Sequence, residues 1–374
     1  MQYHDNGYIP HQKPRRSNAR IFFKTFFKTL ILTLVIMAGG YFSWRHQIRP
    51  PQQPPVHAIL PLHMVMDTQE ANYVSFLTTQ TTGPALADPP SEPPQVSLTS
   101  WQRREDFYTF LLFGLDVHSN VDTIMVAGFD AEAMRGYLIS IPRDTRVDAE
   151  RSTRRINAAY SAGRRNDGGH EGGVRQLKRE VQTLIGFRPD FYISVDMDLV
   201  VSIIDILGGV DIYVPFHMRY DDPCQDLFID IQPGQQTLDG LNALNFARFR
   251  QAERGYREIN DFVRIGHQQI LLNAMLDAAM RPATIPRVPA LIRLGLRDDM
   301  LSTDLDMRNL IWFAEQVVLA RDNFELETYT LPIAGTIWHV WYELPCPQGI
   351  LEMVNRTVNP FTDDITRNML RIAQ

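Results

Sequence analysis

Apolar and polar positions recur along the chain in two patterns, one typical of β-strands and one typical of α-helices. Short apolar runs at residues 110–115, 123–129 and 137–141 follow one another closely, which predicts three neighbouring strands in one sheet. Apolar positions elsewhere predict strands at 191–195, 210–214, 227–231 and 326–331, and helices at 197–207, 238–250, 257–280, 282–296 and 303–321. A glycine-rich polar stretch at 163–173 predicts a loop before an amphipathic helix that ends near Ile185. The alternation of strands and helices predicts an α/β fold whose mixed central β-sheet is flanked by helices on both faces.

The longest apolar segment precedes this region. Residues 21–44 contain an uncharged stretch, Thr29 to Trp44, and they span a bilayer if Lys24 and Lys28 extend toward its surface. This predicts one transmembrane helix. Basic residues before it place residues 1–20 in the cytoplasm and the main domain outside, so we expect a single-pass protein of the cell membrane. A cleaved signal peptide is the first alternative, but its basic N-terminal region would be unusually long, and no small-residue cleavage site occurs before Tyr41. A buried helix of a soluble domain is a weaker alternative.

The segment between the apolar stretch and the globular part is rich in proline. Residues 45–100 hold ten prolines, which predicts an extended extracellular linker, although its apolar part at 58–66 is expected to touch the membrane or the domain. The predicted organisation is therefore a cytoplasmic tail (1–20), a transmembrane helix (21–44), a linker (45–100), a main domain (101–282) and a C-terminal α/β extension packed on that domain (283–374).

Charge and cysteine content exclude some classes of protein. A net charge of -6 argues against a nucleic-acid partner, because such domains carry a basic face. The two cysteines, Cys224 and Cys346, lack metal-binding spacing. In an exported chain they form one disulfide or remain two thiols, and the sequence leaves both open.

The predicted strand at 137–141 ends in two opposite charges. Pro142 stops the strand, and Arg143 and Asp144 follow it at the end of a strand where ligands are bound in open α/β sheets. Alone, such a pair is more often a solvated ion pair. Two carboxylates, Asp116 and Asp122, flank the short loop between the first two strands. They suit Mg²⁺ completed by phosphate oxygens, although paired aspartates also form turns.

Two predicted helices carry further polar groups. Arg248 and Arg250 lie at the end of the helix at 238–250, where bases suit the helix dipole. Asp261, Arg264 and Gln268 follow at i, i+3 and i+7 of the next helix and form one polar stripe that can present donors to an anion. A solvated helix face with an i,i+3 ion pair is the alternative.

These segments together resemble the motifs of one family. The chain is similar to the LytR-CpsA-Psr family over roughly residues 108–280, through GLD at 114–116, VDT at 121–123, SIPRDT at 140–145, RINAAY at 155–160, GGVDIYVP at 208–215, LDGLNALNFARFR at 238–250 and DFVRIGHQQ at 261–269. Seven motifs in the family's order are more specific than any one of them. The sequence differs from the family pattern at His118 and His267, where arginine is usual, and at Arg155, where lysine is common.

The resemblance implies a membrane-anchored phosphotransferase. Family members move a glycopolymer from a polyprenyl-diphosphate carrier to a cell-wall acceptor such as peptidoglycan, through a phosphodiester. Two alternatives stay open: a non-catalytic envelope or scaffold protein that binds polyprenyl diphosphates, and a pyrophosphatase-like hydrolase in which water replaces the acceptor.

The resemblance also implies roles for individual residues. Asp116 and Asp122 match the carboxylates that hold Mg²⁺ on the diphosphate, and Asp261 orients an arginine or assists the acceptor hydroxyl. Asp144 is expected to fix the loop or a neighbouring arginine. Arginine suits the task because its planar fork binds phosphate oxygens in pairs, and phosphoryl transfer depends on positioning and charge neutralisation. The residues matched to contacts with the diphosphate are Arg143, Arg155, Arg248, Arg250, Arg264 and Gln268.

Overall fold

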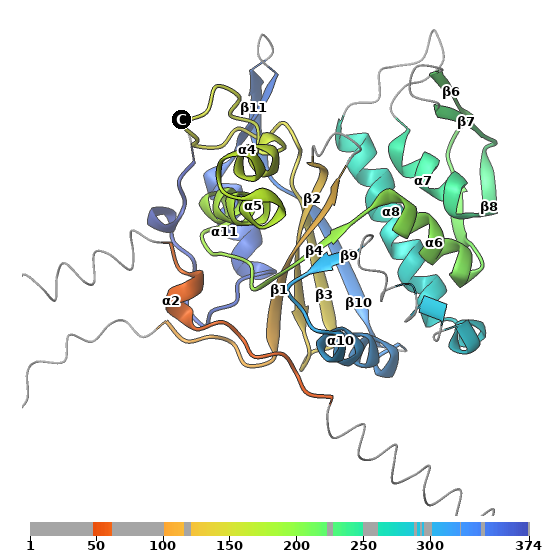
Figure 1. Ribbon diagram of the computed structural model, residues 1–374, viewed down its shortest axis with the longest axis horizontal. Coiled ribbons are helices and arrows are strands. Elements are labelled where there is room, and N and C mark those ends of the chain that lie inside the picture. Colours follow the sequence, from red (N-terminus) through yellow and green to blue (C-terminus); the bar gives the residue numbers. More distant parts are fainter. Residues whose placement is uncertain are drawn as a thin grey trace, which may run out of the picture. The chain divides into compact units, whose positions relative to one another are not determined.

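The computed structural model describes most of the chain beyond its N-terminal region. The described residues are 48–61, 101–115, 121–222, 227–249, 261–287, 290, 291, 294, 301–321, 323–337 and 341–372. By its internal contacts the chain divides into residues 1–50 and 51–374, and every element given below lies in the second unit (Figure 1). Within the described ranges, no helix has both the length and the apolarity needed to cross a membrane. The helix predicted at 21–44 lies outside those ranges.

A six-stranded mixed sheet forms the centre of this unit. Its order is β10-β3-β2-β1-β4-β9, with β1 parallel to β4, β3 parallel to β10, and all other neighbours antiparallel. The three strands predicted as neighbours are β1, β2 and β3, which confirms that prediction. The bounds are β1 Phe107–Leu115, β2 Val121–Asp130, β3 Arg135–Ser140, β4 Phe191–Val195, β9 Leu301–Thr303 and β10 Glu325–Thr330.

Helices cover both faces of this sheet, as predicted. Side chains alternate along β1, so that Leu111 and Phe113 belong to a core shared with α4 (Ala158–Asn166), α5 (Gly169–Ile185) and α11 (Pro347–Arg356). On the opposite face, Tyr108 and Phe110 pack against Phe313 of α10 (Met307–Leu319), with ring centroids 5.2 and 5.0 Å from its ring. The predicted fold class is thereby confirmed.

A second group of elements has a hydrophobic core of its own. The helices α6 (Met197–Leu207), α7 (Gly240–Arg248) and α8 (Asp261–Met280) pack with two antiparallel two-stranded sheets, β5 (Val210–Val214) with β8 (Gly234–Leu238) and β6 (Met218–Asp222) with β7 (Leu227–Ile231). The strands predicted at 210–214 and 227–231 are therefore present, but they lie in these two-stranded sheets outside the central sheet. One face of β5 is exposed, at Asp211 and Tyr213.

One prediction about local structure is wrong, and two predicted helices differ in their bounds or type. The glycine-rich stretch at 163–173 is the end of α4 and the start of α5, because its glycines allow two helices to touch: a Cβ at Gly163 would collide with the Gly172 carbonyl oxygen. The helix predicted from residue 303 begins instead at Met307, where Asp306 caps it by accepting from the Asn309 N–H at 2.8 Å, and the preceding residues form β9. Of the helix predicted at 282–296, residues Pro282–Arg287 form a 3-10 helix, η1.

Residues 51–61, within the predicted linker, pack against the rest of their unit. Ile59, at the end of the short helix α2 (Val56–Ile59), is 2% exposed and belongs to the main core. Its carbonyl oxygen accepts from the Arg188 N–H at 2.8 Å and the Gln182 side chain at 3.1 Å. The apolar part of the linker therefore touches the domain at this point.

The C-terminal extension joins the same unit. It contributes β10 to the central sheet, the hairpin β11 (Ile333–Ile337) and β12 (Tyr342–Pro345), α11, and the 3-10 helix η2 (Arg367–Met369). Cys346, directly before α11, carries a free thiol, and Cys224 lies outside the described residues.

Candidate functional site

The loop that follows β3 forms the base of the candidate site. Thr145 donates two hydrogen bonds to the Pro142 carbonyl oxygen, from its N–H at 3.0 Å and its hydroxyl at 2.6 Å. The Asn157 N–H donates to the Arg143 carbonyl at 3.1 Å. These bonds fix a tight turn that carries Arg143 and Asp144 at the carboxyl end of β3. Because β2 runs antiparallel to β3, the start of β2 lies at the same edge of the sheet.

Arg143 connects three carboxylates at this edge. Its Nη1 donates to Asp122 Oδ1 at 2.7 Å, and its Nε lies 3.7 Å from both Asp144 Oδ2 and Asp261 Oδ1. Burial opposes the charge of Arg143, but the hydrogen bond to Asp122 and the three negative charges raise its pKa. Arg143 is therefore a charged, positioned guanidinium.

Asp144 holds a second arginine beside the first. Its Oδ1 is 3.4 Å from Arg155 Nε, and its side chain is almost fully buried. Burial raises the Asp144 pKa, although the charges of Arg143 and Arg155 oppose this. The Asp144 carboxylate therefore contacts two neighbouring arginines at once.

The first turns of α8 form the opposite side of the site. Arg264, which is 4% exposed, donates from Nη2 to Asp261 Oδ1 at 2.5 Å and to the Asp122 carbonyl oxygen at 3.2 Å. Gln268, one turn later, donates to Thr123 Oγ1 at 3.0 Å. The polar stripe predicted on this helix thus faces the start of β2.

Gln269 fixes α8 to the central sheet at the same edge. Its side-chain nitrogen donates to Ser140 Oγ at 3.0 Å and to the Tyr329 carbonyl oxygen at 2.9 Å. These acceptors lie on β3 and β10, whose carboxyl ends meet here. This contact sets the distance between the α8 stripe and the Arg143 loop.

Some hydrogen-bonding capacity at this site is unused. Among the described residues, Arg143 Nε and Asp261 Oδ2 are buried without any hydrogen-bond partner, because the 3.7 Å contacts of Arg143 Nε are too long for a hydrogen bond. Buried polar atoms are normally paired. A buried donor and a buried acceptor at one site therefore suit a polar ligand that binds between them.

The C-terminal extension supplies residues that sequence patterns did not predict for the site. Glu343 of β12 donates its N–H to the Asp144 carbonyl at 3.0 Å and accepts from the Arg146 N–H at 2.8 Å. The neighbouring Tyr342 accepts from the Arg154 N–H at 3.1 Å. Neither residue lies in a recognisable motif, and no local signal in the sequence links them to the loop after β3.

Other predicted site residues lie elsewhere or outside the described ranges. Arg248 is in the last turn of α7, and no described contact joins it to the Arg143 cluster. Asp116 and Arg250 lie outside the described residues. His267 contributes to the core between helices, where its ring centroid lies 4.7 Å from that of Phe246 in α7, and burial lowers its pKa to about 4.

Among the described residues, one carboxylate at the site suits a hard cation such as Mg²⁺. The Asp122 carboxylate is an oxygen ligand at the rim of the site, with its side chain one-third exposed. No group of three metal-binding side chains occurs within the part of the chain that is described. Mg²⁺ requires no such group, because it binds through one or two carboxylates and takes its remaining ligands from phosphates and water.

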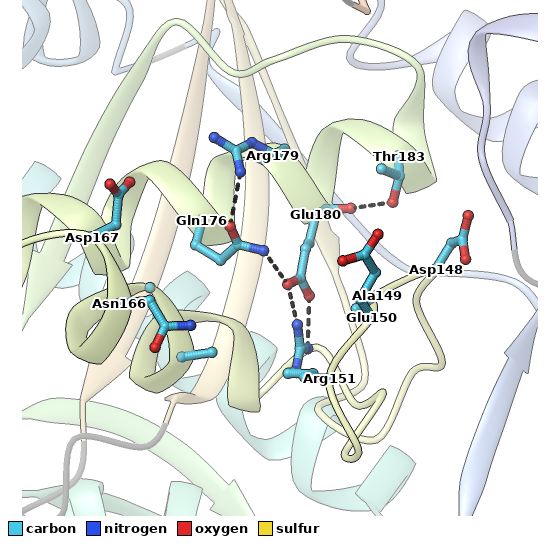
Figure 2. Close-up of a pocket in the computed structure, with 12 residues that line it drawn as sticks. Asp148, Ala149, Glu150, Arg151, Asn166, Asp167, Gln176, Arg179, Glu180 and Thr183 are labelled. Atoms are coloured by element: carbon cyan, nitrogen blue, oxygen red, sulfur yellow. Dashed lines mark hydrogen bonds and ion pairs between the residues drawn. The ribbon is translucent and has the colours of Figure 1, made fainter.

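A separate cavity is lined by residues that follow the Arg143 loop and by α4 and α5. It measures about 600 Å³ and is bounded by residues 148–151, the end of α4 and the middle of α5. Figure 2 shows Arg151 reaching across it to both carboxylate oxygens of Glu180, and Arg151 Nη2 also donates to the Arg155 carbonyl oxygen at 2.6 Å. No residue predicted for the site lines this cavity. Its observed contacts brace the backbone that presents Arg155.

Solved structures share this arrangement of strands and helices. Bacillus subtilis TagV is 23% identical, with a TM-score of 0.54 over 68% of this chain and 96% of that one. A structure described as TagT bound to LIIa-WTA is 19% identical, with a TM-score of 0.51 over 67% and 88% of the two chains. At these identities the likeness concerns the fold alone.

Two sequence relatives carry the names of transferases. TagV of Bacillus subtilis (strain 168), named a polyisoprenyl-teichoic acid–peptidoglycan teichoic acid transferase, is 32% identical over 173 residues, 45% of this chain and 41% of the relative. TagU of Oceanobacillus iheyensis, which has the corresponding name, is 28% identical over 265 residues, 68% and 77% of the two chains.

The extent of these matches differs between relatives. The chain spans 41% of TagV and 35% of LcpB of Corynebacterium glutamicum, a probable cell wall biosynthesis protein. The family model is matched more widely, over residues 73–358. That range contains the Arg143 loop, the α8 stripe and Glu343, so all three belong to the matched region. Over most of its length, therefore, the chain belongs to the LytR-CpsA-Psr family.

Proposed function

We propose that this protein is a phosphotransferase that moves a glycopolymer from a polyprenyl-diphosphate carrier to a cell-wall acceptor such as peptidoglycan. The observation that carries the proposal is the cluster of Arg143, Arg155 and Arg264, held together by aspartates at one edge of the sheet. Three guanidinium groups at one place suit a ligand with several negative charges. The names of the relatives TagV and TagU support the choice of a wall polymer.

The chemistry of the proposed reaction matches these groups. Transfer of a phosphoryl group needs charge neutralisation and alignment more than a strong nucleophile. Arg143 and Arg264 would bind the diphosphate oxygens, and the buried Arg143 Nε has a free hydrogen-bonding position for one of them. Asp261 keeps Arg264 in place through their 2.5 Å contact, so the geometry favours the arginine-orienting role expected for Asp261.

A divalent cation completes the proposal. Asp122, together with Asp116, would hold Mg²⁺, which neutralises charge on the diphosphate when bound. Apolar side chains exposed on α8 suit the prenyl chain of the carrier; they are Phe262, Val263 and Ile270.

The test is a transfer assay with the full-length chain in detergent micelles. A saccharide linked to polyprenyl diphosphate and a peptidoglycan oligomer are mixed with Mg²⁺, and the phosphodiester product is measured by mass spectrometry. Arg143→Ala is expected to lower kcat at least 100-fold, since one preorganised charge-stabilising group is typically worth 10²–10³. Removal of Mg²⁺ by EDTA should stop the reaction, and added Mg²⁺ should restore it.

Arg135→Ala is the matched control for Arg143→Ala. Arg135 is the first residue of β3, at the end of the strand away from the site, and it pairs with Glu325 at 3.2 Å in an exposed position. Its replacement should leave kcat unchanged. Release of saccharide phosphate into water without transfer would instead support the hydrolase alternative. Tight binding of the carrier without any turnover would support the scaffold alternative.

A further inference from the structure

The C-terminal hairpin brings one additional carboxylate to the candidate site. Glu343 on β12 forms a parallel bridge with Thr145, and its N–H and C=O bond to Asp144 and Arg146 at 3.0 and 2.8 Å. The Arg155 guanidinium lies 5.8 Å from the ring centroid of the adjacent Tyr342. Backbone bonds on both sides therefore fix Glu343 next to the Arg143 loop.

The Glu343 carboxylate differs from the other acidic groups in its partners. The residue is 7% exposed, and Thr336 of β11 donates its hydroxyl to Oε2 at 2.8 Å. Among the described residues, no arginine, lysine or histidine forms an ion pair with Glu343. A buried carboxylate without a cation carries a cost that protonation removes.

The other carboxylates of the site that the structure describes are each held by arginine. Asp122 accepts from Arg143, Asp261 accepts from Arg264, and Asp144 lies between Arg143 and Arg155. A proton on any of these three would weaken an ion pair that positions a guanidinium. Glu343 takes a proton without this loss.

We propose that Glu343 is the catalytic base that accepts the proton of the acceptor hydroxyl. The proposal rests on the proposed transferase function. In the transfer step, the acceptor oxygen forms a bond to phosphorus, and the bond between that phosphorus and the bridging oxygen breaks, so that polyprenyl monophosphate leaves. The acceptor's proton moves to a Glu343 oxygen and later passes to solvent. No oxidant or further reactant is needed.

The surroundings of Glu343 suit a base of this kind. Burial raises the pKa of Glu343, and so do the negative charges of Asp144, from the loop after β3, and Asp261, from α8. The hydrogen bond from Thr336 opposes these effects. A general base is most effective when its pKa approaches the working pH.

The experiment compares Glu343→Gln with the unaltered full-length chain in the transfer assay, over pH 5 to 9. The unaltered protein should show kcat rising with pH, as Glu343 loses its proton. Glu343→Gln should lower kcat about 10²–10⁴-fold and lose this rise, while its Tm and its KM for the lipid diphosphate stay close to those of the unaltered protein. Glu343→Asp should restore part of the rate.

Glu352→Gln is the control, because Glu352 is an exposed glutamate on α11 of the same extension; it should behave like the unaltered protein. A different outcome is that the unaltered protein forms the product while Glu343→Gln keeps kcat within about threefold and shows the same rise of kcat with pH. In that case the role proposed for Glu343 is wrong, and the proposed transferase function is unaffected. If the unaltered protein makes no product, the transferase proposal itself fails. If Glu343→Gln and Glu343→Asp both have a lower Tm and a weaker affinity for the lipid diphosphate, Glu343 has a structural role. That result would also overturn the proposal.

A second variant tests the role of Glu343 if Glu343→Gln does not fold. Thr336→Val removes the hydroxyl that lowers the Glu343 pKa. The rise of kcat should then move to higher pH, with little change in the KM for the lipid diphosphate. A rise that stays at the same pH would overturn the proposal.

Discussion

At the scale of single residues, His267 shows how far its position in the fold determines the chemistry of a side chain. It lies between Arg264 and Gln268 in sequence, yet its ring packs on Phe246 and is 5% exposed. Its Nδ1 has no hydrogen-bond partner among the described residues. Burial lowers the His267 pKa to about 4, so the imidazole is neutral at physiological pH. His267 therefore adds no positive charge to the cluster of arginines.

This low pKa predicts a specific loss of stability in acid. Between an ordinary histidine pKa near 6.5 and about 4, the unfolded chain binds a proton at this position that the folded chain does not. The free energy of unfolding therefore falls as pH decreases from about 7 to about 4, and this residue contributes about 3 kcal/mol of the change. His267→Phe should lack that contribution, which urea unfolding at several pH values measures. Equal pH dependence in both proteins would contradict the assignment.

Sequence patterns located those site residues whose placement depends on local structure. Asp261, Arg264 and Gln268 share one side of α8 because of helical periodicity, and Arg143 follows a strand that ends at a proline. Glu343 and Tyr342 were missed because only tertiary pairing with the loop after β3 brings them to the site. No periodicity within β12 contains that information.

At the scale of elements, the same distinction holds. Strands β1 to β4 were predictable because each is a continuous apolar run bounded by turns. Helix α4 and the start of α5 were missed because glycine usually signals a loop, whereas Gly163 and Gly173 here allow close helix contact. In each of the two-stranded sheets β5-β8 and β6-β7 one strand was predicted, β5 and β7, but not its partner, since pairing is a tertiary property.

The segment at 51–61 gives a prediction at this scale. If α2 is part of the fold, Ile59→Ala should lower the free energy of unfolding by about 2–5 kcal/mol, because it leaves a cavity in the main core. Chemical denaturation measures the loss. Val318→Ala, at a 51% exposed position on α10, is the control and should change stability little. An Ile59→Ala protein as stable as the control would mean that this segment is only a tether.

At the scale of the whole molecule, the proposed reaction needs the site close to its lipid substrate. A polyprenyl carrier stays in the bilayer, so the enzyme works best when held at the same surface. The apolar segment at 21–44, at about 1.5 Å per residue in a helix, is long enough for a hydrocarbon layer of about 30 Å. We therefore propose that it anchors the chain in the cell membrane, with residues 1–20 in the cytoplasm and the main domain outside.

Membrane extraction and protease access test this anchor. The full-length chain should remain with membranes after alkaline extraction, whereas Leu34→Arg should reduce insertion, because one arginine at the centre of a span costs about 2.5–3.5 kcal/mol. In intact spheroplasts, added protease should degrade the domain and spare an epitope attached before residue 20. Release of the unaltered chain from the membranes by alkaline extraction would refute the proposed membrane anchor. Protection of the domain together with loss of the epitope would reverse the orientation, and the site would then face the wrong compartment for a wall acceptor.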